Sequence, residues 1–213
     1  PQAIVSDILH NLSDGKINLF HIAYEHVKLS DGKFSGRKGT WKGYTTDQFI
    51  TELMNKIKKA FYSDKSMDKN AFNIAIGAIR YSFLKISSSK TITFSWESAL
   101  NTKGDSGPYL QYALVRAKSI IRKIGNSEMK KHLHSTVANS YVPSDQERKL
   151  VLAILKTKYV VKKPNVTPED MDNYFDIVSL CDQTYTLALE FNKFYATHKV
   201  MGANTEGAKY FRI

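Results

Sequence analysis

The sequence predicts a mainly α-helical protein. Apolar residues recur at spacings of three and four over several long segments, and typical helix-starting and helix-ending residues stand at the ends of these segments. Only residues 19–29 and 91–94 have the pattern of strands. With 213 residues, of which 42% are hydrophobic, the chain can bury a substantial core in one large domain or two small ones.

The N-terminal part of the chain combines helices with a strand and a basic loop. Residues 2–12 place apolar side chains at helical spacing, and the extended residues 19–29 end at the turn formed by residues 30–32. After the loop, Thr45 and Gln48 have the spacing of a capping box, which predicts a helix that continues to about residue 62. The basic loop is therefore expected to lie between a strand and a helix.

A domain boundary is predicted at residues 101–107 (NTKGDSG), because small turn-forming residues there separate two strongly patterned segments. Before this segment we expect a helix over residues 68–86 and the strand at 91–94. The predicted domains are residues 1–103 and residues 104–213.

Three successive helices are predicted after this boundary. The first begins at Pro108 and ends at Gly125, since proline lacks the N–H that a first turn leaves unpaired and glycine tolerates a left-handed cap. The second begins at Ser144, with Glu147 as its capping-box partner. The third begins at residues 167–168 and continues to about residue 196. Helices joined in this way pack as an antiparallel bundle.

The charge of the chain favours a nucleic-acid partner. Its formal net charge is +11, and Lys and Arg gain affinity for polyphosphates by releasing counterions. Charge alone leaves open a basic protein with a solvated face. The single cysteine, Cys181, excludes an internal disulfide and favours a reducing compartment, the cytosol, with the mitochondrial matrix as the alternative. No apolar run approaches the ~20 residues of a membrane span, so no membrane partner is expected.

The loop from Gly32 to Thr40 (GKFSGRKGT) gathers three cations, a hydroxyl and flexible glycines. Glycines allow backbone N–H groups to approach phosphate oxygens, while Lys and Arg supply positive charge for a leaving pyrophosphate. The loop is not a Walker loop, because the sequence Gly-Lys-Ser/Thr before a helix is absent. By itself the pattern also fits an ordinary solvated basic loop.

Further motifs follow the loop in a fixed order. They are IGAIRY at residues 76–81, FSWE at 94–97, GPYLQYA at 107–113 and LEFNKFY at 189–195. Together with the loop, this series resembles the C-terminal half of arginyl-tRNA synthetases, a family of class I aminoacyl-tRNA synthetases. The resemblance runs from about residue 19 to the end of the chain.

The resemblance implies a fold and a reaction. The implied fold is the end of a class I, Rossmann-type catalytic domain, followed by an all-α, DALR-type anticodon-binding bundle that lacks its last helix. The implied activity is that of an ATP-dependent arginine–tRNA ligase, whose partners are tRNA-Arg, arginine and ATP, with Mg²⁺ accompanying ATP. In the KMSKS-like loop, the resemblance gives Lys33, Ser35 and Arg37 a catalytic role, and Lys33, Ser35 and Lys38 a role in binding the ATP phosphates.

Two departures from the family pattern affect the expected activity. Gly36 stands where the general class I loop has its second lysine, and the spacing does not decide whether Arg37 or Lys38 supplies that charge. The His-Ile-Gly-His element of the preceding half occurs nowhere in the chain, so this part alone is expected to be inactive. The alternative is a non-catalytic RNA-binding module with a synthetase-like fold. The expected oligomeric state is a monomer.

The predicted tRNA site lies on the helix that begins at Pro108. Tyr109, Tyr112 and Arg116 recur at spacings of three and four, and aromatic and guanidinium groups stack on unpaired bases. Beside them runs an apolar stripe that is expected to face the bundle, formed by Leu110, Ala113, Leu114, Ala117, Ile121 and Ile124. The alternative is that the two tyrosines pack the bundle core.

No protein-bound metal is expected. His132 and His134 are separated by one residue, but a metal site needs three or four ligands, and no nearby cysteine or carboxylate cluster supplies the others. Both histidines are expected to be surface residues.

Overall fold

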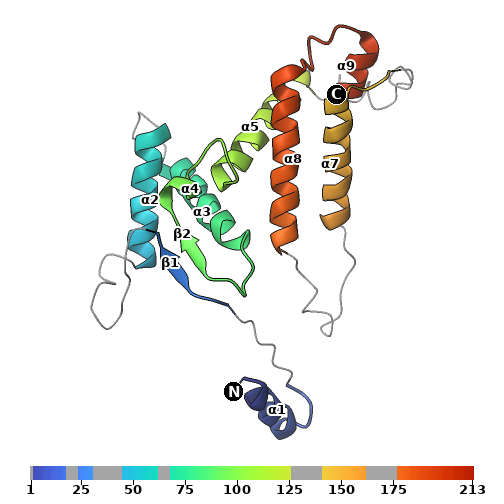
Figure 1. The fold of residues 1–213 in the computed structure, drawn as a ribbon. Helices are drawn as coiled ribbons and strands as arrows, with labels where there is room; N and C mark the ends of the chain where they lie inside the picture. Colours follow the sequence, from blue (N-terminus) through green and yellow to red (C-terminus); the bar gives the residue numbers. More distant parts are fainter. Residues whose placement is uncertain (1, 18–23, 31–44, 62–67, 126–140, 162–176) are drawn as a thin grey trace.

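The computed structural model describes residues 2–17, 24–30, 45–61, 68–125, 141–161 and 177–213. This part of the chain is mainly helical, as the sequence predicts, with one small two-stranded sheet (Figure 1). Among these residues, no helix combines the length and the apolar character that crossing a membrane would require.

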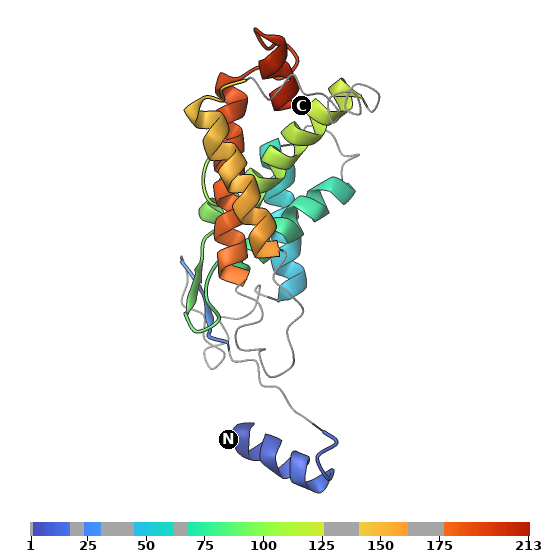
Figure 2. The same cartoon turned by 90° about the vertical axis from the view of Figure 1, so that its right-hand side faces the viewer.

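The first predicted helix is confirmed as α1 (Gln2–Leu12). It lies apart from the remaining helices in both views of the molecule (Figures 1 and 2). The apolar side chains of Ile4, Ile8 and Leu12, which share one helix face, are accordingly exposed.

The sheet pairs β1 (Val27–Leu29) with β2 (Ile92–Phe94) in parallel, with Val27 opposite Ile92. Parallel strands need a long crossover connection. Within the described residues, this crossover contains α2 (Thr46–Phe61) and α3 (Asp68–Leu84). The predicted capping box opens α2, because the backbone N–H of Thr45 donates to Gln48 Oε1 at 3.2 Å and that of Gln48 donates to Thr45 Oγ1 at 3.4 Å.

The crossover helices pack on each other through a small core. Leu53 and Ile57 of α2 and Ala71 and Ala75 of α3 are fully buried. Because alanine side chains are small, the backbones of the two helices can approach closely. An aromatic group formed by Phe49, Phe83, Phe94 and Trp96 then joins these helices to β2 and to the short helix α4 (Trp96–Ala99).

The helix predicted from Pro108 to Gly125 is confirmed as α5 (Gly107–Ile124), with Ser106 as its N-cap and Gly125, at φ 75°, as its C-cap. At its start α5 crosses α3 without space for a side chain. A Cβ atom at Gly107 would lie 2.7 Å from the carbonyl oxygen of Gly77 and 2.8 Å from Cα of Ala78. The C-terminal end of the segment 101–107 is therefore packed against α3, so the segment is not a free linker. The domain boundary placed there stays a prediction.

The second and third predicted helices are α7 (Asp145–Val161) and α8 (Ile177–Thr197), which run antiparallel side by side (Figures 1 and 2). The capping box of α7 is confirmed, since Ser144 N–H donates to Glu147 Oε2 at 2.7 Å and Glu147 N–H donates to Ser144 Oγ at 3.3 Å. The predicted start of the third helix at residues 167–168 lies outside the described residues. A short helix that the sequence analysis missed, α9 (Glu206–Arg212), ends the chain.

A buried ion pair fastens α9 to the start of α7. Arg212 Nε donates to Glu147 Oε1 at 2.6 Å, and the two side chains are 12% and 1% exposed. Tyr141 Oη donates to Glu147 Oε2 at 2.9 Å. Burial alone would raise the pKa of Glu147, but the hydrogen bonds from Arg212, Ser144 and Tyr141 outweigh it and lower the pKa to about 2.

This ion pair predicts a pH dependence of stability. A carboxyl group whose folded pKa lies below its ordinary value of 4.5 stabilises the fold fully above pH 4.5, and this contribution disappears as the pH falls through about 2. We expect the free energy of unfolding to fall by ~3 kcal/mol over this range from Glu147 alone. Glu147→Gln should abolish that slope and, by leaving Arg212 unpaired, should cost ~3–5 kcal/mol at neutral pH.

Urea titrations at several pH values measure both effects. Arg148→Gln is the matched control, because it removes an ion pair to Asp145 in which both side chains are exposed, at 54% and 84%. If Glu147→Gln keeps the pH slope of the unchanged protein, Glu147 does not carry the effect.

Candidate nucleic-acid interface

The residues proposed to bind the ATP phosphates cannot be placed. Lys33, Ser35, Arg37 and Lys38 all lie outside the described residues, within 31–44. Their role stays a prediction. The histidines at 132 and 134 also lie outside the described part.

The structure divides the predicted tRNA-binding stripe on α5. Tyr109 is only 8% exposed and packs in a core cluster with Ala113 and with Ala188 of α8, and its ring lies 5.7 Å from that of Tyr185. This burial favours the alternative interpretation, packing of the bundle, while a role of Tyr109 in stacking on a base stays a prediction.

The other two residues of the stripe form an accessible cluster with residues of α8. Tyr112 is 49% exposed and Tyr195 is 41% exposed. The guanidinium carbon of Arg116 lies 4.1 Å from the ring centre of Tyr112 and 4.8 Å from that of Tyr195. With Asn192, these side chains make up what we call the Tyr–Arg cluster, which spans α5 and α8.

Hydrogen bonds fix the orientation of Arg116 in this cluster. Its Nη1 donates to Asn192 Oδ1 at 2.9 Å, and its Nη2 donates to Tyr112 Oη at 2.8 Å. The planar guanidinium is thus held in one position between two aromatic rings, which lowers the entropy cost of contacting a ligand. Among the described residues, Asn192 Nδ2 is a buried donor without a hydrogen-bond partner in the protein.

The exposed face of α5 continues beyond the cluster with a cation. Residues 112, 116 and 123 differ by four and seven positions, so the exposed Lys123 lies on the same helix face as Tyr112 and Arg116. Lys118 and Arg122 are exposed on another face of the same helix. Aromatic rings, a fixed guanidinium and a nearby ammonium are the groups that bind unpaired bases and their phosphates.

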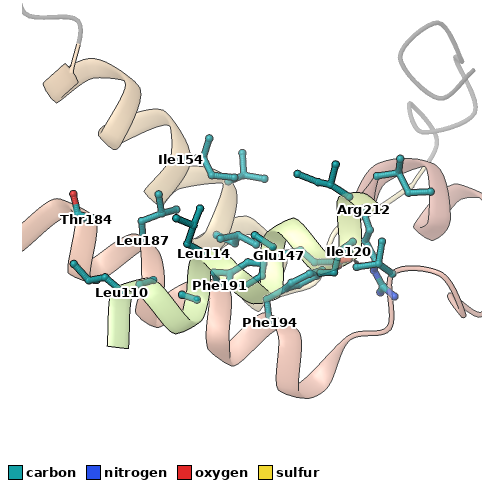
Figure 3. Close-up of a pocket in the computed structure, with 18 of the residues that line it drawn as sticks. Leu110, Leu114, Ile120, Glu147, Ile154, Thr184, Leu187, Phe191, Phe194 and Arg212 are labelled. Atoms are coloured by element: carbon teal, nitrogen blue, oxygen red, sulfur yellow. Dashed lines mark hydrogen bonds and ion pairs between the residues drawn. The ribbon is translucent and has the colours of Figure 1, made fainter. Parts of the chain in front are cut away.

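A separate apolar groove of about 730 Å³ lies between α5, α7, α8 and the C-terminal residues. Figure 3 shows Leu114, Ile154 and Leu187, from these three helices, around it. Leu114 and Ile121 line the groove and are 53% and 50% exposed, so part of the stripe that was expected to face a closed core faces an open groove instead. Glu147 and Arg212 are also part of its lining. These mostly apolar walls do not suit phosphates or the edges of bases.

The sequence analysis missed Asn192 and Tyr195 as members of the site. Both lie in the LEFNKFY motif, so a signal existed, but their spacing on α8 does not reveal that they face Arg116 of another helix. No group of three or more metal-ligating side chains occurs within the part that the structure describes.

Comparisons with known proteins relate the chain to one family. Residues 110–213 match the DALR anticodon binding domain. The chain is 38% identical to the arginine–tRNA ligase of Pyrococcus abyssi over 95% of its own length, and 37% identical to that of Pyrococcus furiosus over 100%. It covers 32% and 34% of these two relatives, or about a third of each.

Solved structures give the same result. The arginyl-tRNA synthetase of Thermus thermophilus matches the whole chain with a TM-score of 0.73 and 28% identity, and the chain covers 34% of that structure. The synthetase of Plasmodium falciparum, at 23% identity and a TM-score of 0.57, over 99% of this chain and 35% of that one, supports the fold alone.

The different environments of the two tyrosines predict different effects on stability. Tyr109→Ala should cost about 3–5 kcal/mol, because it leaves a cavity between α5 and α8. Tyr112→Ala, at an exposed position, should cost about 1 kcal/mol or less. Thermal or urea unfolding of the two variants checks this, and equal losses of stability would show that the two rings are not buried differently.

Proposed function

We propose that the chain is the tRNA-binding part of an arginine–tRNA ligase. The proposal is supported by its match to the DALR anticodon binding domain and by its homology to the C-terminal part of arginine–tRNA ligases. In this function, the complete ligase activates arginine with ATP and transfers it to tRNA-Arg. The observation that carries the proposal is the Tyr–Arg cluster, which lies within the matched domain at residues 110–213. The lone buried Cys181 fits a reducing compartment, for which we propose the cytosol.

The cluster has the chemistry needed to bind an anticodon loop. The half-exposed rings of Tyr112 and Tyr195 offer faces on which unpaired bases stack. Arg116, held between them, adds cation–π attraction and hydrogen-bond donors to base edges. Lys123, on the same face of α5, follows the phosphate backbone. Base contacts thus give preference for an anticodon, while the lysine contributes affinity for any tRNA.

The basic loop has the complementary role in the proposed reaction. An oxygen of the arginine carboxylate attacks the α-phosphorus of ATP, the bond to the bridging oxygen breaks, and pyrophosphate leaves with the negative charge. Lys33, Ser35, Arg37 and Lys38 stabilise this charge on the β- and γ-phosphates. Mg²⁺ would enter with ATP as its counter-ion. A hydroxyl at the 3′ end of the tRNA then attacks the arginyl carbonyl carbon, the bond to the phosphate oxygen breaks, and AMP leaves.

Binding of anticodon stem-loops tests the proposal on the 213-residue chain. The stem-loop of tRNA-Arg and one with a swapped anticodon are titrated at several salt concentrations. Tyr112→Ala and Tyr195→Ala should each weaken the cognate stem-loop by roughly 1–3 kcal/mol and reduce the preference for its anticodon. Lys123→Ala should weaken both stem-loops alike and lower the salt slope by about one.

Lys118→Ala is the matched control, because it removes the same charge from another face of α5 and should affect binding less. Unchanged affinity and unchanged anticodon preference in both tyrosine variants would contradict the proposed site. Binding without preference for the cognate stem-loop would favour a general RNA-binding module.

The role of the loop is tested in the complete ligase. Lys33→Ala should lower the rate of ATP–pyrophosphate exchange, measured with arginine and tRNA present, by roughly 10²-fold, because one preorganised charge-stabilising group is lost. Lys90→Ala, at an exposed lysine in the turn before β2, should leave the rate unchanged. If Lys33→Ala and the unchanged enzyme have equal exchange rates, Lys33 does not stabilise the charge on the leaving pyrophosphate.

A further inference from the structure

We propose that Tyr81, Lys85 and Asp105 form a joint that fixes the angle between α3 and the helices that carry the Tyr–Arg cluster. The proposal rests on the proposed function, in which this angle places the anticodon relative to the ATP-binding loop. The three residues are therefore positioning residues for aminoacylation. Figure 1 shows α3 between α2 on one side and α5 and α8 on the other.

The hydroxyl of Tyr81 contacts two elements at once. From α3, Tyr81 Oη donates to Asp105 Oδ1 at 2.5 Å, in the segment that leads into α5. The same oxygen lies 3.4 Å from the carbonyl oxygen of Cys181 on α8. The ring itself is buried. Burial first, and then the hydrogen bond to Asp105, raise the pKa of Tyr81 well above its ordinary value, so the hydroxyl keeps the proton that it donates.

Lys85 also binds Asp105, through hydrogen bonds to its carboxylate and to its main chain. Its Nζ donates to Asp105 Oδ2 at 3.0 Å and to the Asp105 carbonyl oxygen at 2.7 Å. Both carboxylate oxygens and the main chain of Asp105 are thus tied to α3. The Lys85 ammonium also lies 5.7 Å from the centre of the Tyr81 ring, so the three side chains form one network.

The position of Asp105 determines where α5 begins. The next residue, Ser106, is buried and caps the helix by accepting a hydrogen bond from Tyr109 N–H at 3.3 Å, while its hydroxyl donates to the carbonyl oxygen of Asn101. Gly107 then lies against α3 with no space for a Cβ atom. Because the hydrogen bonds are directional and Gly107 leaves no space, α5 cannot turn relative to α3 without breaking these contacts.

A small rotation at this joint would have a large effect at the Tyr–Arg cluster. Cys181 and Tyr195 are fourteen positions apart on α8, which corresponds to ~21 Å at 1.5 Å per residue. A tilt of about 10° at Cys181 would therefore move Tyr195 by roughly 4 Å. Since displacements of about 1 Å at a reacting group can cost up to 10²-fold in rate, the angle matters for transfer to the tRNA 3′ end.

The joint itself is tested by distance measurements on the 213-residue chain. Spin labels attached to cysteines introduced at Asn55 of α2 and Ala196 of α8 report the angle through the distance measured by double electron–electron resonance. The native cysteine is removed by Cys181→Ala, which retains the backbone carbonyl of residue 181. Tyr81→Phe should broaden or shift the distance distribution. Tyr159→Phe removes a hydroxyl from an exposed tyrosine of α7 and should leave the distribution unchanged.

Kinetics of the complete ligase test the positioning role. Tyr81→Phe should lower kcat for aminoacylation of full-length tRNA by roughly tenfold, whereas the Kd of the chain for the anticodon stem-loop should stay within about twofold. Asp105→Asn keeps an oxygen acceptor for Tyr81, so its kcat should lie closer to that of the unchanged enzyme than that of Asp105→Ala. A merely structural role would instead weaken stem-loop binding and kcat together.

The possible results separate the two proposals. An unchanged distance distribution in Tyr81→Phe overturns the joint, whether or not the protein is a ligase. A changed distribution with unchanged kcat overturns the positioning role. A complete protein that does not charge tRNA contradicts the proposed function, while the distance measurement still decides whether the joint exists.

Discussion

The close approach of α5 to α3 at Gly107 is the constraint on which the rest of the structure depends. The backbone of Gly107 touches Gly77 and Ala78, and no other residue type fits without moving one helix. This contact fixes the start of α5, which in turn fixes the direction in which Tyr112 and Arg116 point. Because the segment before Gly107 is also tied to α3 by Tyr81 and Lys85, the crossing is held by packing and by directional polar contacts together.

Networks of directional polar contacts join elements that apolar packing alone would leave free to slide. Asp105 is satisfied by Tyr81 and Lys85, and Glu147 is satisfied by Arg212, Tyr141 and the backbone of Ser144. Hydrophobic contact is non-directional, whereas these hydrogen bonds allow only one arrangement. One network fixes α5 against α3, and the other fixes the C-terminal helix against α7.

The helix α5 has two edges with different chemistry, because α8 packs between them. On one edge, Tyr112 and Arg116 meet Asn192 and Tyr195 and form a polar, aromatic surface that suits unpaired bases. On the other edge, leucine and isoleucine side chains line the apolar groove. A single helix thus separates the proposed RNA-binding surface from an apolar one, and the ring of Tyr109 lies in the core between them.

Local signals in the sequence determined where the helices begin and end. The capping pairs of Thr45 with Gln48 and of Ser144 with Glu147 involve residues three positions apart, so their hydrogen bonds form within one turn regardless of the rest of the fold. The order of the motifs likewise indicated the family. The sequence did not decide which tyrosine of α5 faces solvent, since positions 109 and 112 differ by only about 60° around the helix axis. The placement of α8 buries Tyr109 and brings Asn192 and Tyr195 to Arg116, and such contacts between residues distant in sequence exist only once the helices have packed.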